Sequence, residues 1–313
     1  MIISQDLFRQ VLVEPFRTAD ELRIVSGYAT SMMARRHIET CQNLRISLIV
    51  GMGITDGISM SNHRGFVGLE GQMDGSFTCR YNTGVPTHSK LYVWYSAGQP
   101  VMAYIGSANY TQRAFIQHVQ NEILCCCDPR EADTYYQSII HSSVSCTEPD
   151  IENRIPLLNR LILRRTPIVR PQGTQAPMPC EMTHEVELPL VDRRGNVPAR
   201  SGLNWGQRNN RNHNEAYLSI PASIARSGFF PPRTIHFNVL TDDGVTMVFS
   251  VAQDTNKALH TPEDNSIMGH YFRRRLGLQD GEFVTRTHLE AYGRTTVTML
   301  KDDEENYYLD FSV

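Results

Sequence analysis

The chain has 313 residues and a formal net charge of −3; 20% of its residues are charged and 41% are hydrophobic. This length suits two domains, each able to bury a core of ordinary size. No apolar run approaches a membrane span, and the first residues lack the basic-then-apolar pattern of a signal peptide. We therefore expect a globular, cytoplasmic protein without membrane contact.

The chain contains 7 cysteines, an odd number. A disulfide framework is therefore not expected, and a reducing cytosol is the default compartment. Three of them are consecutive, at 125–127. Adjacent strand residues point to opposite faces, so three in a row do not converge on one metal ion, and we predict buried small strand residues instead.

Strands and helices alternate through residues 1–127. The patterns predict strands at 21–26, 44–50 and 77–81, and helices at 4–13, 32–40 (with Ser31 as cap) and 57–70. Such alternation predicts an α/β domain with a mixed, largely parallel sheet flanked by helices. Ligands bind at the carboxyl ends of strands in such sheets, so the turn at 28–31 either lines a site or is a simple connector.

A hairpin signal follows, with strands at 90–95 and 101–105 around a turn at 96–100. His88 and Lys90 are two residues apart at the mouth of the first strand, so their side chains share one face. A hairpin of this length returns Ser107 and Asn109 beside them. The sequence thus predicts an imidazole, a cation, a hydroxyl and an amide around one small volume.

This set of groups suits a phosphodiester. An imidazole attacks phosphorus or protonates a leaving oxygen, while a lysine and neutral donors hold the nonbridging oxygens. No cluster of carboxylates of the metal-binding kind accompanies these residues. We therefore predict chemistry without a metal or any other cofactor.

The second half of the chain has a different pattern. Helices are predicted at 131–141 and 151–163, and a segment rich in Pro and polar residues follows. We predict one domain at 1–165, a linker at 166–183 and a second domain at 184–313. Short strands at 186–190, 216–220, 234–240, 246–251, 295–300 and 307–311, with helices at 222–227, 266–276 and 286–292, predict a mostly β, barrel-like domain.

Basic and amide side chains gather in this second domain. Arg, Asn and Gln read purine edges in the major groove, and arginines also hold phosphates. The candidate DNA-binding residues in the loop 202–214 are Trp205, Gln207, Arg208, Asn210, Arg211 and Asn212. A solvated loop in which Trp205 is only a packing anchor is the alternative. Asn256, Lys257 and the helix that contains Arg273 are a second candidate, equally well explained as a solvated helix face.

The first domain resembles the phospholipase D superfamily. His88-x-Lys90 followed by Gly106-Ser107-x-Asn109 looks like its His-Lys motif, and Glu122 falls where that family often carries a supporting acid. The resemblance departs in two ways. The family's Asp five residues after the Lys is replaced by Tyr95, and the Gly-Ser-x-Asn arrives four residues late.

The whole chain resembles the NgoFVII-type restriction endonucleases, which join such a nuclease domain to a DNA-binding pseudobarrel like that of plant transcription factors. Residues 201–207, 214–217 and 271–277 carry the second resemblance. It implies site-specific hydrolysis of double-stranded DNA, read by two arms at 203–213 and 254–260. It also implies an ATPase or a methyltransferase of a restriction–modification system as a partner.

Phospholipase D-type catalysis uses two histidines, yet this chain has a single His-x-Lys. We therefore predict a homodimer in which two copies of His88 meet at one composite site and one forms a phosphohistidine. Two functions of other classes stay open. One is a phosphodiesterase acting on a lipid or nucleotide; the other is a DNA-binding protein whose nuclease domain is latent and needs a partner.

Overall fold

A computed structural model describes residues 1–117, 120–158 and 185–313. They fall into two compact units, Met1–Asn159 and Arg160–Val313, and each is described by itself. The predicted linker, 166–183, lies outside the described residues. No helix in the described part of the chain is long and apolar enough to cross a membrane.

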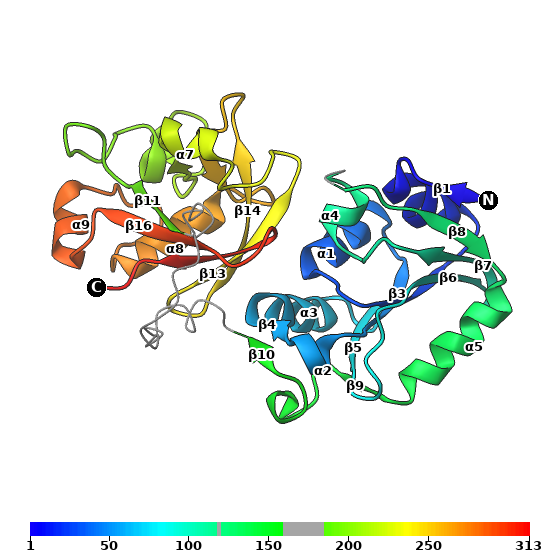
Figure 1. Cartoon of the computed structure of the whole chain (residues 1–313). Helices are drawn as coiled ribbons and strands as arrows, with labels where there is room; N and C mark the ends of the chain where they lie inside the picture. Colours follow the sequence, from blue (N-terminus) through cyan, green and yellow to red (C-terminus); the bar gives the residue numbers. More distant parts are fainter. Residues whose placement is uncertain (118–119, 159–184) are drawn as a thin grey trace, which may run out of the picture. The chain divides into compact units, whose positions relative to one another are not determined.

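The first unit is built on an eight-stranded sheet in the order β1-β8-β7-β6-β2-β3-β5-β9 (Figure 1). Its strands are β1 (Ile2–Ile3), β2 (Glu21–Ser26), β3 (Arg45–Val50), β5 (Phe77–Asn82), β6 (Lys90–Ser96), β7 (Gln99–Gly106), β8 (Leu124–Cys127) and β9 (Ser143–Ser145). The predicted hairpin is confirmed as β6 and β7. Parallel pairing is confined to β2, β3 and β5, so the sheet is mixed as predicted, but its other ladders are antiparallel and "largely parallel" was wrong.

Helices cover both faces of this sheet (Figure 1). On one face, α1 (Ser31–Thr40) and α3 (Met60–Gln72) bury Met33, Ile38 and Phe66 against Leu48 and Tyr92. On the other face, α5 (Pro129–Ile140) buries Ala132 and Tyr136 against strand residues of β2, β3 and β6. Each helix is anchored at its N-terminus by a side chain that accepts a backbone N–H. For α1 this cap is Thr30 rather than the predicted Ser31.

Short elements complete the unit and correct three predictions. The predicted helix at 4–13 is irregular, a π-helical turn at Phe8–Val13 followed by a 3-10 turn at Glu14–Arg17. In place of the predicted helix at 151–163 the described residues form a 3-10 turn at Ile151–Asn153 and a strand β10 (Leu157–Leu158), which pairs with β4 (Ile58–Ser59). The cysteines at 125–127 lie on β8 as predicted but are exposed or half-buried, because β8 is next to the short edge strand β1 and no helix covers it fully. The short helices α2 (Gly53–Asp56) and α4 (Gln112–Phe115) follow β3 and β7.

The second unit is a seven-stranded sheet in the order β11-β16-β17-β13-β14-β15-β12. Its strands are β11 (Glu185–Pro189), β12 (Leu218–Ser219), β13 (His236–Thr241), β14 (Thr246–Ala252), β15 (Ala258–His260), β16 (Thr296–Lys301) and β17 (Asn306–Asp310). The edge strands β11 and β12 come close to each other, so the sheet is nearly closed and the predicted pseudobarrel is confirmed. The strand at 258–260 was not predicted. Helices α7 (Ala222–Ser227), α8 (Ser266–Arg275) and α9 (Arg286–Tyr292) lie where the sequence predicted them.

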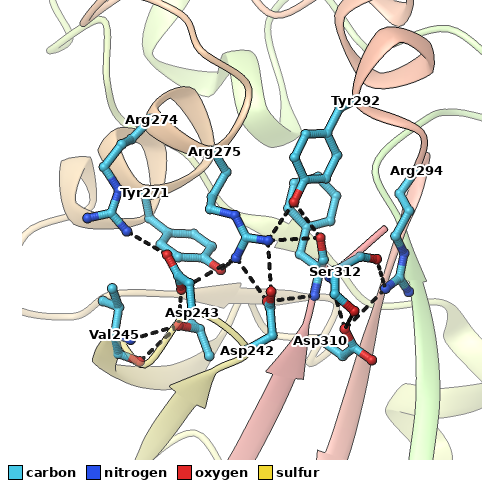
Figure 2. Close-up of polar contacts among 12 residues, drawn as sticks. Asp242, Asp243, Val245, Tyr271, Arg274, Arg275, Tyr292, Arg294, Asp310 and Ser312 are labelled. Carbon is cyan, nitrogen blue, oxygen red and sulfur yellow. Dashed lines mark hydrogen bonds and ion pairs between the residues drawn. The ribbon is translucent and has the colours of Figure 1, made fainter.

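An ion-pair cluster around Arg275 joins α8, α9, the β13–β14 turn and the end of the chain (Figure 2). The guanidinium donates to both carboxylate oxygens of Asp242 at 2.9 and 2.8 Å and to the Phe311 carbonyl at 3.1 Å. Asp242 in turn accepts the Phe311 N–H at 2.9 Å. Arg275 is 14% exposed and Asp242 12%, so the pair is largely removed from water.

We expect Arg275→Ala to destabilise the second unit by about 3 kcal/mol, because removal of one partner leaves a largely buried carboxylate uncompensated. The measurement is urea unfolding followed by Trp205 fluorescence in a Trp94→Phe background. The exposed Arg226→Ala is the control and should change the free energy of unfolding by less than about 0.5 kcal/mol. Equal effects of the two substitutions would contradict a stabilising role of the cluster.

Candidate active site

The candidate site lies where β2 and β3 end and β6 begins. Ser26 of β2 and Lys90 of β6 are register partners. Beyond them the backbone continues in hydrogen bonds, with Gly27 N–H donating to Ser89 O at 3.1 Å and Thr87 N–H donating to Gly51 O at 3.2 Å. The segment that carries His88 is therefore held between the loops that follow two parallel strands.

Two glycines make this close approach sterically feasible. A Cβ on Gly27 would lie 2.6 Å from His88 Cδ2, and one on Gly51 would lie 2.1 Å from the Thr87 carbonyl oxygen. Both separations are shorter than any real contact of that kind, so a side chain at either position would displace the His88 segment. Gly27 and Gly51 are therefore part of the site, because the absence of their side chains leaves room for the His88 segment.

His88 is exposed, and its ring packs against Tyr28, with ring centroids 5.4 Å apart and planes at 72°. The sequence left open whether the turn at 28–31 lines a site or only connects a strand to a helix, and the turn does both. Tyr28 reaches His88, while Thr30 caps α1.

Lys90 is buried at the edge of this cluster, 6% exposed. Its ammonium donates to the His88 carbonyl oxygen at 2.6 Å. Burial lowers the pKa of Lys90 because it disfavours the charged amine, and the Glu122 carboxylate opposes this shift. The cation is thus held beside the imidazole-bearing residue in a partly desolvated place, where its charge is screened less than in water.

Glu122 and Ser107 form a second pair. Glu122 is 7% exposed and accepts hydrogen bonds from the Ser107 hydroxyl and from the Gln120 amide. The Ile123 N–H donates to Ser107 Oγ at 3.0 Å, and the Ser107 N–H donates to the Ile123 carbonyl at 2.9 Å. Ser107 is exposed and fixed from both sides by the start of β8.

Asn109 joins the end of the hairpin to β2. Its side-chain oxygen accepts from the Tyr28 N–H at 3.2 Å and from the Ser26 hydroxyl at 3.5 Å. The fully buried Ser26 hydroxyl also accepts from the Tyr110 N–H at 2.9 Å. Contacts thus join Asn109 to His88 through Tyr28, and Lys90 to His88 directly. Ser107 contacts Glu122, whose charge acts on the Lys90 ammonium, so the five residues that the sequence singled out lie in one neighbourhood.

Tyr95, which stands where the phospholipase D superfamily carries an Asp, lies away from these residues. Tyr95 is at the far end of β6, where its buried ring lies 4.0 Å from the Arg23 guanidinium and its hydroxyl donates to Asp133. The replacement of Asp by Tyr therefore takes no group away from the cluster around His88.

Sequence reasoning missed two residues that border the site. Asp56, at the end of α2, accepts from the Tyr28 hydroxyl, and Tyr135 on α5 contacts the Thr87 hydroxyl at 2.8 Å and the Ser89 hydroxyl at 3.1 Å. Neither belongs to a motif, because they come from separate elements that only the fold brings together. Within the described residues, no group of three or more His, Cys, Asp or Glu is placed to hold a metal ion.

The candidate DNA-binding residues of the second unit fall into two groups. Exposed members are Arg208, Asn210, Arg211, Asn212, Asn256 and Lys257. Trp205 is half-buried, with the Arg211 guanidinium 3.9 Å from its ring and the Tyr217 ring 5.6 Å away. It is therefore a packing anchor that also holds an exposed arginine.

The loop after η4 (Gly202–Gln207) and the turn between β14 and β15 border one pocket of about 240 Å³. Trp205, Arg208 and Arg211 line it from one side, and Gln253 and His260 from the other. The two segments predicted as arms are thus neighbours on the same surface.

Two of the predicted DNA contacts are held inside the unit. Arg273 is fully buried, and its guanidinium donates to the carbonyls of Glu282 at 2.8 Å, Leu203 at 3.2 Å and Gly269 at 3.3 Å. Its assignment to DNA contact was wrong, because a side chain inside the core cannot reach a groove; the helix period places Arg273 inward and Arg274 outward. Gln207 is half-buried and donates to the Gly281 carbonyl at 2.9 Å, which leaves its side chain little freedom to contact DNA.

The lowered pKa of Lys90 gives a prediction for stability. The unfolded chain keeps the ordinary value of 10.5, so below it the unfolded chain holds more protons than the folded one and the stability contribution of Lys90 rises with pH. The free energy of unfolding of the wild type, relative to Lys90→Met, should therefore increase as the pH rises from neutral toward 10.5. Urea titrations at several pH values measure this difference. Replacement of the exposed Lys257 by Met is the control, and a flat difference for both would contradict the prediction.

Comparison with known proteins gives two family matches in the same order as the two units. Residues 5–153 match the N-terminal phospholipase D domain of the NgoFVII restriction endonucleases, and residues 179–303 match their C-terminal B3-like DNA-binding domain. No curated protein matches the chain.

Solved structures resemble one domain each. NucT from Helicobacter pylori has 16% identity and a TM-score of 0.33, covering 46% of this chain and 97% of its own. Nuc from Salmonella typhimurium, a phospholipase D family member, has 13% identity and a TM-score of 0.32, covering 43% and 87%. A hypothetical Arabidopsis thaliana protein has 16% identity and a TM-score of 0.22, covering 42% and 92%.

The identification rests on the family matches, which together span both units of the fold. The chain carries a restriction-endonuclease nuclease domain and a DNA-binding domain, as its sequence predicted. It therefore belongs to the NgoFVII family of restriction endonucleases, DNA-cleaving hydrolases with an N-terminal phospholipase D domain and a C-terminal B3-like domain.

Proposed function

We propose that this sequence-specific nuclease hydrolyses double-stranded DNA without a metal ion, through a phosphohistidine at a site composed by two copies of the chain. The observation that carries the proposal is that contacts join the exposed His88 to Lys90 and Asn109, while the Ser107–Glu122 pair is near enough for its charge to act on Lys90. An exposed imidazole, a buried ammonium and neutral donors in one volume suit the transfer of a phosphoryl group.

The proposed reaction has two steps. In the first, a ring nitrogen of one His88 attacks phosphorus; a P–N bond forms, the bond from phosphorus to the 3′ oxygen breaks, and the second copy's His88 donates a proton to that oxygen. In the second, water attacks phosphorus, the P–N bond breaks, and the second His88 takes the proton from water. The products carry a free 3′ hydroxyl and a 5′ phosphate, and both histidines return to their starting protonation states.

The remaining residues support the charges of this reaction. Lys90 offsets the negative charge of the nonbridging phosphate oxygens, Asn109 offers an amide donor, and the Ser107 hydroxyl would donate to a phosphate oxygen in place of Glu122. Glu122 holds Ser107 and keeps a negative charge near Lys90. Its role in the proposal is to position the donor and to favour the protonated lysine.

An exposed apolar row next to the site supports the dimer. Ile2, Cys125 and Ile105 are register neighbours across β1, β8 and β7, and the row continues into the buried Leu91 of β6. Ile2 is 68% exposed and Ile105 45%, and Ile123, which directly precedes β8, is also 45% exposed. Ile105 directly precedes Gly106 and Ser107, so a second copy packed on this row would bring its own site close to the first.

The proposed DNA-reading surface consists of the exposed Arg208, Asn210, Arg211 and Asn212 with Asn256 and Lys257. These side chains lie on the two segments that border the common pocket. Arginine and asparagine suit base edges in the major groove, and lysine suits a phosphate. An ATPase or methyltransferase partner stays a prediction from the family resemblance.

The first test is cleavage of plasmid and phage DNA in excess chelator. Wild-type protein should give discrete fragments, and His88→Ala should give none, because the nucleophile is lost. His141→Ala replaces an exposed histidine outside the proposed site and should cleave like the wild type.

Several outcomes would contradict the proposal. Activity of His88→Ala would exclude His88 as the nucleophile, and cleavage only after addition of Mg²⁺ would exclude the metal-free reaction. Sequence-specific binding of DNA without cleavage by the wild type would favour a reader that needs a partner. Hydrolysis of a lipid phosphodiester instead of DNA would favour the other branch of the superfamily.

A second test concerns the dimer. Ile105→Arg places a charge in the apolar row, so we expect a monomer that binds DNA and loses cleavage at least 10-fold. Light scattering during gel filtration and a cleavage assay measure the two effects. Ile267→Arg changes an isoleucine of similar exposure in the other unit and should remain dimeric. A dimeric, active Ile105→Arg protein would show that the interface lies elsewhere.

A further inference from the structure

Tyr28 is the side chain that contacts the ring of His88 and is itself tied to a carboxylate. We propose that Tyr28 and Asp56 are positioning residues that hold the His88 imidazole in its attacking orientation. This inference rests on the proposed role of His88 and adds two residues that no motif of the chain contains.

Apart from Tyr28, few groups restrict the orientation of the His88 ring. Its ring is exposed, and within the described residues no side chain donates to or accepts from its nitrogens. Gly27 limits the ring on one edge, since even a Cβ there would be 2.6 Å from Cδ2. The Tyr28 ring, at 5.4 Å and 72°, provides the second contact, and such edge-to-face pairs have a preferred geometry. These two contacts restrict the imidazole ring without occupying either of its nitrogens. A ring nitrogen is therefore free to attack phosphorus.

Tyr28 can orient a neighbour because it is fixed at three points. Its N–H donates to Asn109 at 3.2 Å, its carbonyl accepts from the buried Ser26 hydroxyl at 2.6 Å, and its phenol donates to Asp56. Tyr28 is 41% exposed, so without Asp56 its ring would be free to change rotamer. The hydrogen bond to Asp56 raises the pKa of the Tyr28 hydroxyl, so the phenol stays protonated and remains a donor.

Asp56 comes from a different part of the fold. It ends α2, which follows β3, and its N–H donates to Met52 O at 3.0 Å. Met52 N–H in turn donates to Gly27 O at 3.0 Å. The carboxylate is therefore held by the same backbone network that holds the His88 segment, and Asp56, Tyr28 and His88 form a chain of contacts across the ends of two parallel strands.

A positioning role predicts a change in rate rather than in DNA affinity. Loss of the ring should lower the single-turnover rate of cleavage by about 10-fold in Tyr28→Ala, with the dissociation constant for DNA changed less than about 2-fold. Tyr28→Phe keeps the ring and loses the bond to Asp56, so it should lose about 3-fold, which is about half of the alanine defect in activation free energy. Asp56→Ala should match Tyr28→Phe, and Asp56→Asn, which keeps an acceptor, should lose less than Asp56→Ala.

The measurements are single-turnover cleavage, DNA affinity by mobility shift, and the yield of covalent enzyme–DNA on denaturing gels at alkaline pH. All use the full chain. Asp74→Asn, an exposed aspartate with a left-handed φ of 41° that asparagine tolerates, is the control for Asp56. Circular dichroism and thermal unfolding show that each variant is folded.

The outcomes separate this inference from the proposed function. A wild-type rate in Tyr28→Ala, with His88→Ala inactive, would overturn the positioning role alone. Weaker DNA binding with an unchanged rate would also overturn it, because Tyr28 would then be a DNA contact. An active His88→Ala protein would overturn the proposed function itself. A fall in rate and in covalent yield that follows the order given above, at constant affinity, would support the inference.

Discussion

The His88 segment is held by backbone hydrogen bonds to the ends of β2 and β3 at a distance that leaves no room for side chains. Gly27 and Gly51 carry this constraint, and Gly106 repeats it at the other end of the hairpin, where a Cβ would lie 2.1 Å from the Ile123 carbonyl. Glycine permits such close approach because it has no Cβ. The position of Ser107 beside β8, and so its contact with Glu122, follows from the same approach. Backbone hydrogen bonds therefore fix the positions from which the side chains of the site extend.

The role of a charged side chain in each unit depends on how deeply it is buried. Lys90 and Glu122 are almost completely buried at the site, where the charge of Glu122 opposes the effect of burial on the Lys90 ammonium and the field of the cation is screened less than in water. In the second unit, Arg273 and Arg275 are also buried but are saturated with carbonyl and carboxylate partners, so they stabilise the barrel and the end of the chain. Arg208 and Arg211 lie exposed at the rim of the pocket, where Arg208 donates to the Arg200 carbonyl and Arg211 pairs with Glu215. A polyanion can reach both guanidinium groups there. Burial, not residue type, separates the arginines that hold the fold from those proposed to read DNA.

Much of the fold was predictable because local patterns specify it strongly. The hairpin at β6 and β7 was placed within a few residues, since two runs rich in apolar and aromatic residues around a turn with Gly and Pro are characteristic of paired strands. The three helices of the second unit were also predicted to within one residue at each end. Predictions that depend on which strands are neighbours in the sheet were less accurate. The sheet is mostly antiparallel because β6, β7 and β8 pair beside β2, and the order of strands is not written in any one strand. The same limit explains why 125–127 were expected to be buried, since only the sheet shows that β8 lies near an edge.

The sequence by itself indicated the class of chemistry, because local rules place His88, Lys90, Ser107 and Asn109 together on one hairpin. The resemblance of this motif and of segments in the second unit to known proteins indicated the family. The sequence also determined which segments of the second unit are rich in DNA-binding side chains. The tertiary structure decided the rest. It placed Arg273 in the core and Arg211 at the surface. It also brought Tyr28 to His88, and Asp56 of α2 to Tyr28. These contacts depend on strand order and on the close approach of backbones, which involve residues far apart in the chain, so no local pattern encodes them.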